Sequence, residues 1–191
     1  TTMGCVGESG CGKSTFGRTL IHLYESTDGQ IIYQGRDVTR LSKSGINDLR
    51  HEMQIIFQDP YASINPRMTI EDTIREALIL SKRFPRHQIS AETKKLIDLV
   101  GINLRMLRAY PRELSGGMRQ RVSIARALAI DPKFIVCDEP VSALDVSVQA
   151  QILNLLQDLQ KDMGLTYLFI THDMSVVKHI SDKIAVMYLG Q

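Results

Sequence analysis

A glycine-rich octapeptide near the N-terminus, Gly7 to Ser14, constrains the fold of this chain more than any other stretch. It reads GESGCGKS and fits the pattern G-x-x-x-x-G-K-[ST], in which backbone amides turn inward around phosphate groups. The run before it, Met3 to Val6, is short and apolar like a buried strand, and the run from Ser14 to Leu23 can be helical with Phe16, Leu20 and Leu23 on one side. A strand, a glycine-rich loop and a helix in this order predict a phosphate-binding loop.

The residue types within this loop suit a nucleotide and its metal ion. Its glycines let the backbone approach phosphates without Cβ clashes, and the start of the helix adds partial positive charge. We expect Lys13 to reach the β- and γ-phosphates and the Ser14 hydroxyl to bind Mg²⁺. Cys11 is either a reactive thiol or a tolerated small residue, and we favour the second. The predicted ATP-binding residues here are Gly7, Glu8, Ser9, Gly10, Cys11, Gly12, Lys13, Ser14 and Thr15.

Length and composition narrow the class of protein. The 191 residues, 43% of them hydrophobic, are enough for one domain with a buried core. A formal charge of +2 is too small to indicate a nucleic-acid partner. Three scattered cysteines indicate a reducing compartment, with neither a disulfide framework nor a metal site. No apolar run reaches the roughly 18 residues of a membrane span, so we expect any membrane association to go through a protein partner.

Strand-like and helical segments alternate along the chain. Residues 29–33, 53–57, 134–137, 165–171 and 183–189 have the apolar, β-branched and aromatic content of strands. This alternation predicts an α/β fold with a parallel sheet covered on both faces. Residues 66–130 interrupt it with helices only. We therefore expect a single domain over 1–191, with a core formed by 1–65 and 131–191 and an inserted helical lobe at 66–130.

Capping residues mark where the helices are expected to begin. Thr69 precedes a helix that places Ile70, Ile74 and Leu78 on one face. We also expect Ser90 and Ser147 to cap helices, and Ser115 to precede another. Gly164 is expected to end the long helix that follows Ser147.

Polar residues follow two more of the predicted strands. In an open α/β sheet the ligand lies beyond the carboxyl ends of the strands, so Asp138, Glu139 and His172 should meet the phosphate loop. Asp138 is the expected Mg²⁺ carboxylate, and Glu139 is placed to orient the attacking water. A γ-phosphate contact suits His172. Without the loop upstream, an Asp-Glu pair would more often be a solvated turn and a single histidine a surface residue.

A second anion-binding loop follows at Ser115, Gly116 and Gly117, where paired glycines open a helix. Two such loops in one chain leave two possibilities. Both hold one nucleotide within a monomer, or each site is completed across a dimer.

Taken together, these motifs resemble those of the ATP-binding subunits of ABC transporters, over essentially the whole chain. The resemblance implies a P-loop NTPase fold of the ABC ATPase type, with a parallel-sheet core, an inserted helical lobe and a partial antiparallel β region. The matching motifs are Walker A at Gly7–Ser14, the Q-loop Gln58, the signature at 114–118, Walker B at 135–139, the D-loop at 142–145 with Asp145, and the switch histidine His172.

The resemblance also implies partners and roles. ATP would lie between the Walker A loop of one subunit and the signature loop of a second ATPase subunit, identical or different, in a head-to-tail dimer. Mg²⁺-dependent hydrolysis would drive transmembrane permease subunits from the cytoplasmic, inner face of the cell membrane, and a coupling helix of the permease would dock near Gln58. The implied catalytic residues are Glu139, His172, Gln58 and Lys13, the metal ligands are Ser14, Gln58 and Asp138, and the signature contacts are Ser115, Gly116 and Gly117.

Two segments, residues 58–67 and 145–152, look like those of the oligopeptide and dipeptide importers, which implies peptide import. The alternative is a soluble ABC-type ATPase that acts on DNA or ribosomes. Such relatives often carry long insertions, whereas the interval from Gln58 to Ser115 has room only for a small lobe. A nucleotide sensor that does not hydrolyse ATP is a third possibility, and Glu139 and His172 argue against it.

The chain departs from the family pattern in two places. Met118 stands where the signature usually has glutamine, and we expect a modest effect. The aromatic residue that stacks on adenine lies upstream of Walker A in the family and has no counterpart, so we expect a chain truncated at both ends that binds ATP weakly. The family's strand order also puts a strand between Cys5 and Cys137, roughly 10 Å apart and too far for a disulfide.

Overall fold

The computed structural model describes all 191 residues, and a five-stranded sheet in the order β4-β5-β6-β1-β7 forms its centre. Every neighbouring pair of these strands is parallel, which confirms the predicted α/β core. The strands are β1 (Thr2–Gly7), β4 (Met53–Ile56), β5 (Phe134–Asp138), β6 (Thr166–Thr171) and β7 (Lys183–Met187).

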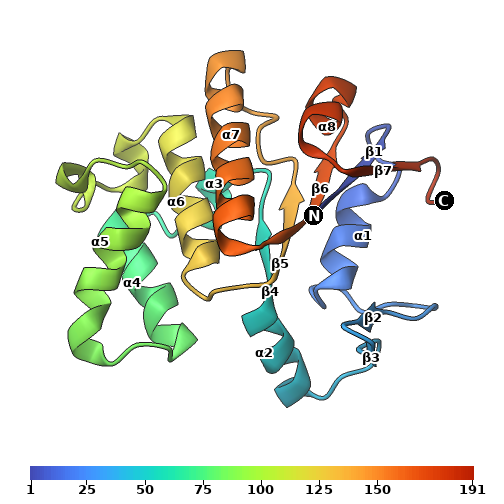
Figure 1. Ribbon diagram of the computed structural model, residues 1–191, viewed down its shortest axis with the longest axis horizontal. Helices are drawn as coiled ribbons and strands as arrows, with labels where there is room; N and C mark the ends of the chain where they lie inside the picture. The colour runs from blue at the N-terminus through green and yellow to red at the C-terminus, as the bar shows by residue number, and fades with distance from the viewer.

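Eight α-helices surround the sheet (Figure 1). A separate antiparallel pair, β2 (Ile32–Tyr33) and β3 (Arg36–Asp37), confirms the partial antiparallel region. Short 3₁₀ turns lie at Arg86–Gln88, Leu104–Met106 and Pro111–Glu113. The helices are α1 (Lys13–Leu20), α2 (Lys43–Glu52), α3 (Pro60–Ser63), α4 (Ile70–Ser81), α5 (Ile89–Leu99), α6 (Gly116–Leu128), α7 (Val146–Met163) and α8 (Met174–Ile180).

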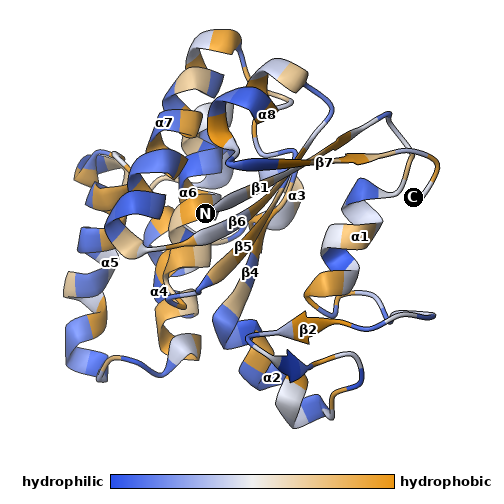
Figure 2. Ribbon diagram, turned by 45° about the vertical axis from the view of Figure 1, so that its right-hand side comes forward, coloured by the Kyte–Doolittle hydropathy of each residue, from blue (hydrophilic) through white to orange (hydrophobic).

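The central strands are buried on both faces. Ile135 and Cys137 of β5 belong to a large core with residues of α4 to α8, whereas Val136 between them packs in a smaller core with Ile21 and Leu49. Figure 2 shows α1 on one side of the sheet and α6 and α7 on the other. Because successive side chains of a strand point to opposite faces, one continuous apolar run fills both cores.

Helices α4, α5 and α6 contact one another at one end of the molecule, and α6 also contacts β4 and α7. Of these three helices, α6 is therefore the one that packs against the sheet. The division into a lobe at 66–130 and a core at 1–65 and 131–191 stays a prediction.

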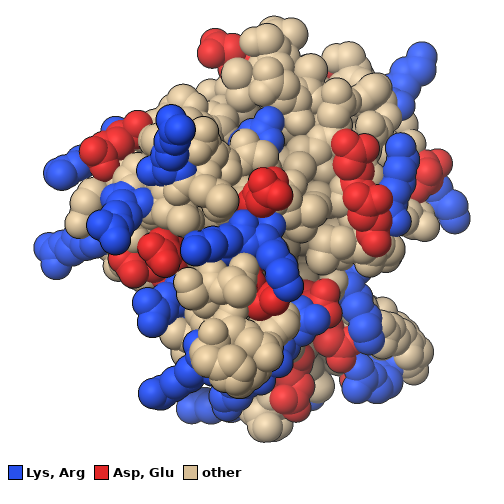
Figure 3. Space-filling model, turned by 60° about the vertical axis from the view of Figure 1, so that its left-hand side comes forward, with Lys and Arg blue, Asp and Glu red and all other residues tan.

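The small net charge hides an uneven distribution. Residues 66–130 carry 13 Lys and Arg against 6 Asp and Glu, whereas the whole chain carries 23 against 21. Figure 3 shows basic side chains spread over the face where α4 and α5 come forward. Residues 66–130 are thus strongly basic and the rest of the chain is acidic, a separation that affects long-range attraction of anions.

Three of the predicted helix ends are confirmed. Thr69 accepts a hydrogen bond from the amide of Asp72 at 3.1 Å, and Ser115 accepts one from Met118 at 3.3 Å. Both side chains therefore satisfy amides that the first turn leaves free. Gly164 ends α7 in the left-handed conformation with φ of 66°.

The other two predicted caps are wrong. Helix α5 begins at Ile89 directly after a 3₁₀ turn, so Gln88 has helical angles and Ser90 lies within the first turn. A capping residue needs an extended backbone, which this continuous helical path does not provide. Helix α7 begins at Val146, and Asp145 rather than Ser147 occupies the extended position before it.

The apolar side predicted for the first helix is also wrong. Phe16 and Leu23 are 42% and 43% exposed, and α1 ends before Leu23. The side that faces the sheet instead presents Gly17, where an added Cβ would lie 2.7 Å from the Ile170 side chain and 2.9 Å from that of Val136. A small residue lets α1 approach the sheet closely. The predicted strand at 29–33 is shorter, since only Ile32 and Tyr33 pair.

Strand β6 lies between β1 and β5, which confirms the predicted separation of Cys5 from Cys137. Both thiols are free and buried. Burial raises the pKa of the Cys137 thiol, so this group stays protonated and packs as a small apolar side chain. No helix combines the length and the apolar composition that a bilayer crossing requires.

The difference between the central and edge strands predicts a difference in mutational cost. Ile170 of β6 is fully buried, whereas Ile184 of β7 is 45% exposed. We expect Ile170→Ala to lower the free energy of unfolding by about 2–5 kcal/mol, because it leaves a cavity in the core. Ile184→Ala, the matched control, should cost less than about 1 kcal/mol. Chemical denaturation of both variants measures this, and equal costs would contradict the described burial.

Candidate functional site

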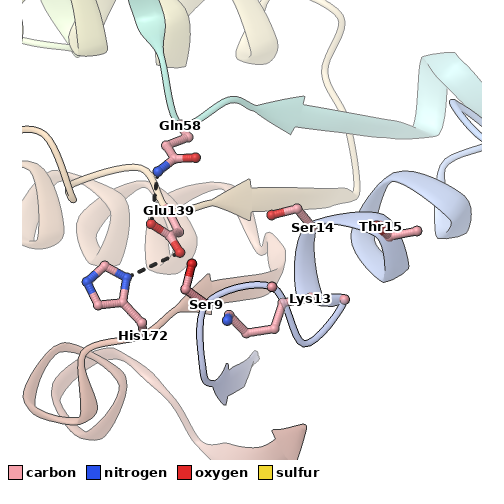
Figure 4. A pocket seen from close by; sticks show the side chains of 9 residues that line it. Ser9, Lys13, Ser14, Thr15, Gln58, Glu139 and His172 are labelled. Atoms are coloured by element: carbon pink, nitrogen blue, oxygen red, sulfur yellow. Dashed lines mark hydrogen bonds and ion pairs between the residues drawn. The ribbon is translucent and has the colours of Figure 1, made fainter. Parts of the chain in front are cut away.

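A polar cavity of about 460 Å³ lies where β1, β5 and β6 end. It is formed by four segments that are far apart in the sequence. None of the residues that line it is hydrophobic, as suits a charged ligand (Figure 4). The lining residues are Ser9, Gly10, Gly12, Lys13, Ser14, Thr15, Gln58, Glu139 and His172.

The loop between β1 and α1 has the conformation that phosphate binding requires. Gly10 and Gly12 have φ of 81° and 103°, a region that disfavours other residues. The Lys13 ammonium donates hydrogen bonds to the carbonyl oxygens of Gly7 and Glu8, both at 2.8 Å. Lys13 is only 4% exposed, so its positive charge is held against the inside of the loop and at the wall of the cavity.

Gly7 and Cys11 form the underside of this loop. A Cβ on Gly7 would lie 2.1 Å from the carbonyl oxygen of Met187 and 2.8 Å from the sulfur of Cys11, so only glycine fits there. Cys11 is 8% exposed, and its sulfur lies 3.8 Å from the Lys13 ammonium. The burial of Cys11 agrees with the interpretation of a small packed residue. Gly7, Glu8 and Cys11 shape the loop without lining the cavity.

Asp138 is fully buried behind the loop, and its two oxygens have different partners. The Ser14 hydroxyl donates to Oδ1 at 2.6 Å, and the Arg18 guanidinium donates to Oδ2 at 3.0 Å. Asp138 does not itself line the cavity but is joined to it through Ser14. Arg18 is a site residue that the sequence analysis missed. Its spacing of four residues from Ser14 in one helix was the available signal, since such residues share a helix face.

The residues around Ser14 fit a magnesium ion. The Ser14 hydroxyl, the Asp138 carboxylate and the Gln58 amide are all oxygen ligands, the type that this hard cation prefers. The chain has no group of three or more His, Cys, Asp or Glu side chains that could hold a metal alone. Magnesium sites beside phosphates commonly use only one or two carboxylates and take other ligands from the nucleotide and water.

Glu139 lies between Gln58 and His172. The Gln58 amide nitrogen donates to Oε2 at 3.0 Å, and Nδ1 of His172 lies 3.2 Å from Oε1. Figure 4 shows the amide oxygen of Gln58 pointing away from this contact. An amide and an imidazole therefore fix the Glu139 carboxylate. Its side chain is still 14% exposed, so the carboxylate can reach a water molecule in the cavity.

The backbone of Glu139 is strained, with φ of 48°. Such a conformation costs about 1–2 kcal/mol for a residue with a side chain. Its neighbours hold it in place: the Glu139 amide donates to the Ile170 carbonyl at 3.0 Å, and the Ser142 hydroxyl donates to the Glu139 carbonyl at 3.1 Å. The strained turn aims the side chain into the cavity directly after β5.

His172 is positioned by the start of α8. The Asp173 side chain accepts hydrogen bonds from the amides of Ser175 and Val176, and its own amide donates to the Thr171 hydroxyl at 3.1 Å. The hydrogen bond from the Ser175 hydroxyl lowers the pKa of Asp173, with the backbone amides adding to the effect. An ionised cap therefore fixes the turn that presents His172, whose side chain is 56% exposed.

The second predicted anion loop lies outside this cavity. Ser115, Gly116, Gly117 and Asp145 are absent from its lining. Ser115 is exposed, whereas Gly117 is buried, and a Cβ on Gly117 would lie 2.5 Å from the Val148 side chain of α7. One chain therefore does not bring its two loops to the same cavity. Of the two possibilities raised by the sequence, this geometry favours a site completed by another chain.

Helix α6, which the second loop opens, is joined to the segment after Gln58. The Arg119 guanidinium lies 5.0 Å from the centre of the Tyr61 ring, and the hydroxyls of Ser63 and Ser123 are 3.3 Å apart. Arg126 donates to the Ser63 carbonyl. We name these contacts between α3 and α6 the polar strip. Sequence analysis did not identify it, although residues 119, 123 and 126 recur at helical spacing.

A protein-family model described as ABC transporter matches residues 1–142. The chain belongs to the ABC transporter family. It is 55% identical, over its full length, to the oligopeptide transport ATP-binding protein OppF of Bacillus subtilis (strain 168), and it spans 63% of the length of that protein. It is also 53% identical to the glutathione import ATP-binding protein GsiA of Shigella boydii serotype 4 (strain Sb227), with 100% of this chain and 30% of GsiA covered.

Solved structures show the same fold. The chain superposes on the ATP-binding cassette MJ0796, solved as a dimer in a post-hydrolysis state bound to ADP and Pi, with a TM-score of 0.87 and 28% identity. The match covers 99% of this chain and 82% of that cassette. The ABC ATPase fold inferred from the sequence motifs is therefore confirmed.

The strained backbone at Glu139 predicts an unusual order of stabilities. Glu139→Gly and Glu139→Ala both remove the carboxylate, but only glycine relieves the positive φ. We expect the glycine variant to be more stable than the alanine variant by about 1 kcal/mol, measured by chemical denaturation. At Ala143, an exposed neighbour without a positive φ, change to glycine should lower stability instead. An alanine variant at 139 as stable as the glycine variant would refute the strain.

Proposed function

We propose that this chain binds and hydrolyses ATP as part of an ABC importer of peptides, with each site completed head to tail by a second ATP-binding subunit. The observation that carries the proposal is the single cavity that joins the phosphate loop to Glu139, Gln58 and His172. The second anion loop lies elsewhere on the chain, which supports a site shared between subunits. The related cassette MJ0796 was solved as a dimer with ADP and Pi.

Each residue of the cavity has a role suited to its position. The amides of residues 7–15 and the Lys13 ammonium bind the phosphates and neutralise charge in the transition state. Ser14, Asp138 and Gln58 hold Mg²⁺, which when bound neutralises charge on the phosphate oxygens. Glu139 orients the attacking water and accepts its proton. His172 keeps Glu139 in place and contacts the γ-phosphate, which argues against a sensor that does not hydrolyse ATP.

The signature loop of the second subunit closes the site. Ser115, Gly116 and Gly117 of that subunit bind the γ-phosphate, and Asp145 lies beside them in the D-loop. ATP becomes part of the interface, so its binding closes the dimer and its hydrolysis releases it. The basic character of residues 66–130, which carry this loop, strengthens the attraction to a triphosphate held by the other subunit.

Transport requires a membrane partner. We place the chain on the cytoplasmic face of the cell membrane, where its helical lobe at 66–130 passes movement from Gln58 to permease subunits. Peptides are the proposed cargo, because relatives named as oligopeptide transport ATP-binding proteins are similar over the whole chain. Action on DNA or ribosomes finds no support among these relatives.

Removing the charge of Glu139 tests hydrolysis directly. We expect Glu139→Gln to lower ATP turnover at least about 100-fold, because the amide cannot accept a proton, and to change ATP affinity by less than about threefold. Phosphate release and binding of a fluorescent ATP analogue measure the two effects. Glu25→Gln, the same change at an exposed carboxylate that forms no hydrogen bond or ion pair, serves as the matched control. Unchanged turnover in Glu139→Gln would refute the assigned role.

Replacing Ser115 tests the shared site. In the Glu139→Gln background, Ser115→Ala should weaken ATP-induced dimerisation at least about fivefold, because it removes a contact with the partner's nucleotide. Thr69→Ala is the matched control, since it also removes a helix cap of the lobe, at a similar cost of about 1 kcal/mol. Light scattering with and without ATP measures dimerisation. Equal weakening by both variants would attribute the effect to lobe stability alone.

A further inference from the structure

We propose that Arg18 is a positioning residue for the magnesium site: its guanidinium is the counter-charge of buried Asp138 and keeps that carboxylate aimed at Ser14. The inference rests on the proposed function, since it assigns a task within the same ATP site.

Burial makes a counter-charge for Asp138 necessary. The Asp138 side chain is 1% exposed, and an isolated ionised carboxylate in such surroundings is strongly disfavoured. Asp138 forms an ion pair with Arg18 and with no other cation of the chain. Lys13, the other cation of α1, donates to loop carbonyls instead. Arg18 is therefore the one cation that directly balances the charge of the buried Asp138 carboxylate.

The two contacts of Asp138 also fix its orientation. Arg18 holds Oδ2 at 3.0 Å, which leaves Oδ1 to accept the Ser14 hydroxyl at 2.6 Å. Ser14 and Arg18 lie one turn apart in α1, so one rigid helix carries both contacts. Charge-assisted hydrogen bonds are short and directional, and together they define a single carboxylate rotamer. Arg18 thus determines which oxygen accepts the Ser14 hydroxyl.

Arg18 is itself held in place on its outer side. Its Nη1 donates to the Tyr24 hydroxyl at 3.3 Å, and the Tyr24 amide donates to the Arg18 carbonyl at 3.4 Å. Arg18 and Gln58 also line a second cavity of about 270 Å³. Gln58 borders both cavities, so Arg18 contacts one candidate metal ligand, Asp138, and shares a cavity with another, Gln58.

Loss of Arg18 should therefore affect metal-dependent binding selectively. Without Arg18, no cation would fix Oδ2, and the Asp138 carboxylate would be free to rotate away from Ser14. The loop amides and Lys13, which bind phosphate without metal, keep their own contacts. ATP affinity in the presence of Mg²⁺ should fall, while affinity in EDTA should stay nearly constant.

The test compares ATP affinity in Mg²⁺ and in EDTA for the intact protein and five variants, by fluorescence of a labelled ATP analogue. We expect Arg18→Met to reduce the gain in affinity from Mg²⁺ at least fivefold and to change affinity in EDTA less than twofold. Arg18→Lys, which keeps the charge but loses the planar fork, should show a gain in affinity from Mg²⁺ between those of the wild type and Arg18→Met. Arg50→Met, the same change at an exposed arginine of α2, is the matched control and should stay within twofold of the wild type.

A double variant separates positioning from general packing. Asp138→Asn already removes the carboxylate on which Arg18 acts. Adding Arg18→Met to Asp138→Asn should therefore reduce the gain in affinity from Mg²⁺ by less than a further twofold. Thermal unfolding checks that each variant is folded, and Arg18→Lys replaces Arg18→Met if the latter is not. Equal losses in Mg²⁺ and EDTA, or an unchanged Mg²⁺ gain, would overturn the role of Arg18. A wild type with no Mg²⁺ gain would instead refute the proposed function.

Discussion

The parallel hydrogen bonding of β1, β6 and β5 is the constraint on which the whole site depends. Val6 pairs with Thr171, and Asp138 pairs with Ile170, so the three strands end at nearly the same level. The chain then leaves each strand in a different way: as a glycine-rich loop, as a strained turn at Glu139 and as the capped start of α8. Because parallel strands point the same way, all three exits meet at one edge of the sheet. A shift of register in any pair would separate the phosphate loop from its carboxylates.

The charged groups at this edge are each satisfied by a different kind of partner. Lys13 is held by carbonyl oxygens, Asp138 by a hydroxyl and a guanidinium, and Glu139 by an amide and an imidazole. No direct ion pair joins Lys13 to either carboxylate, although the three lie in neighbouring turns. Lys13 therefore carries a positive charge at the cavity wall that no carboxylate pairs with directly. This separation suits the metal-bound polyanion of the proposed function.

Much of this arrangement could be predicted from the sequence, because its signals are local. The glycine loop, the apolar strands and the polar residues directly after them specify both the sheet and the cavity lining. Arg18 and the polar strip could not be predicted as easily, since each depends on a partner more than fifty residues away. The exposed side of α1 was misread because Gly17 carries no apolar signal, although it makes the closest approach to the sheet. Ser90 and Ser147 had suitable side chains, but the backbone path into each helix decided where it begins.

The polar strip between α3 and α6 has a mechanical consequence. Arg119, Ser123 and Arg126 span two turns of α6, so the segment after Gln58 is fastened along a length of helix rather than at a single pivot. A displacement of Gln58 would therefore be passed on as a tilt of the entire helix, and Gly116 and Gly117, which open that helix, would move with it. Such a lever needs no flexible linker between the glycine-rich loop after β1 and the glycines that open α6. In the proposed function, the nucleotide cavity and the surface offered to the second subunit would therefore move together as one rigid body.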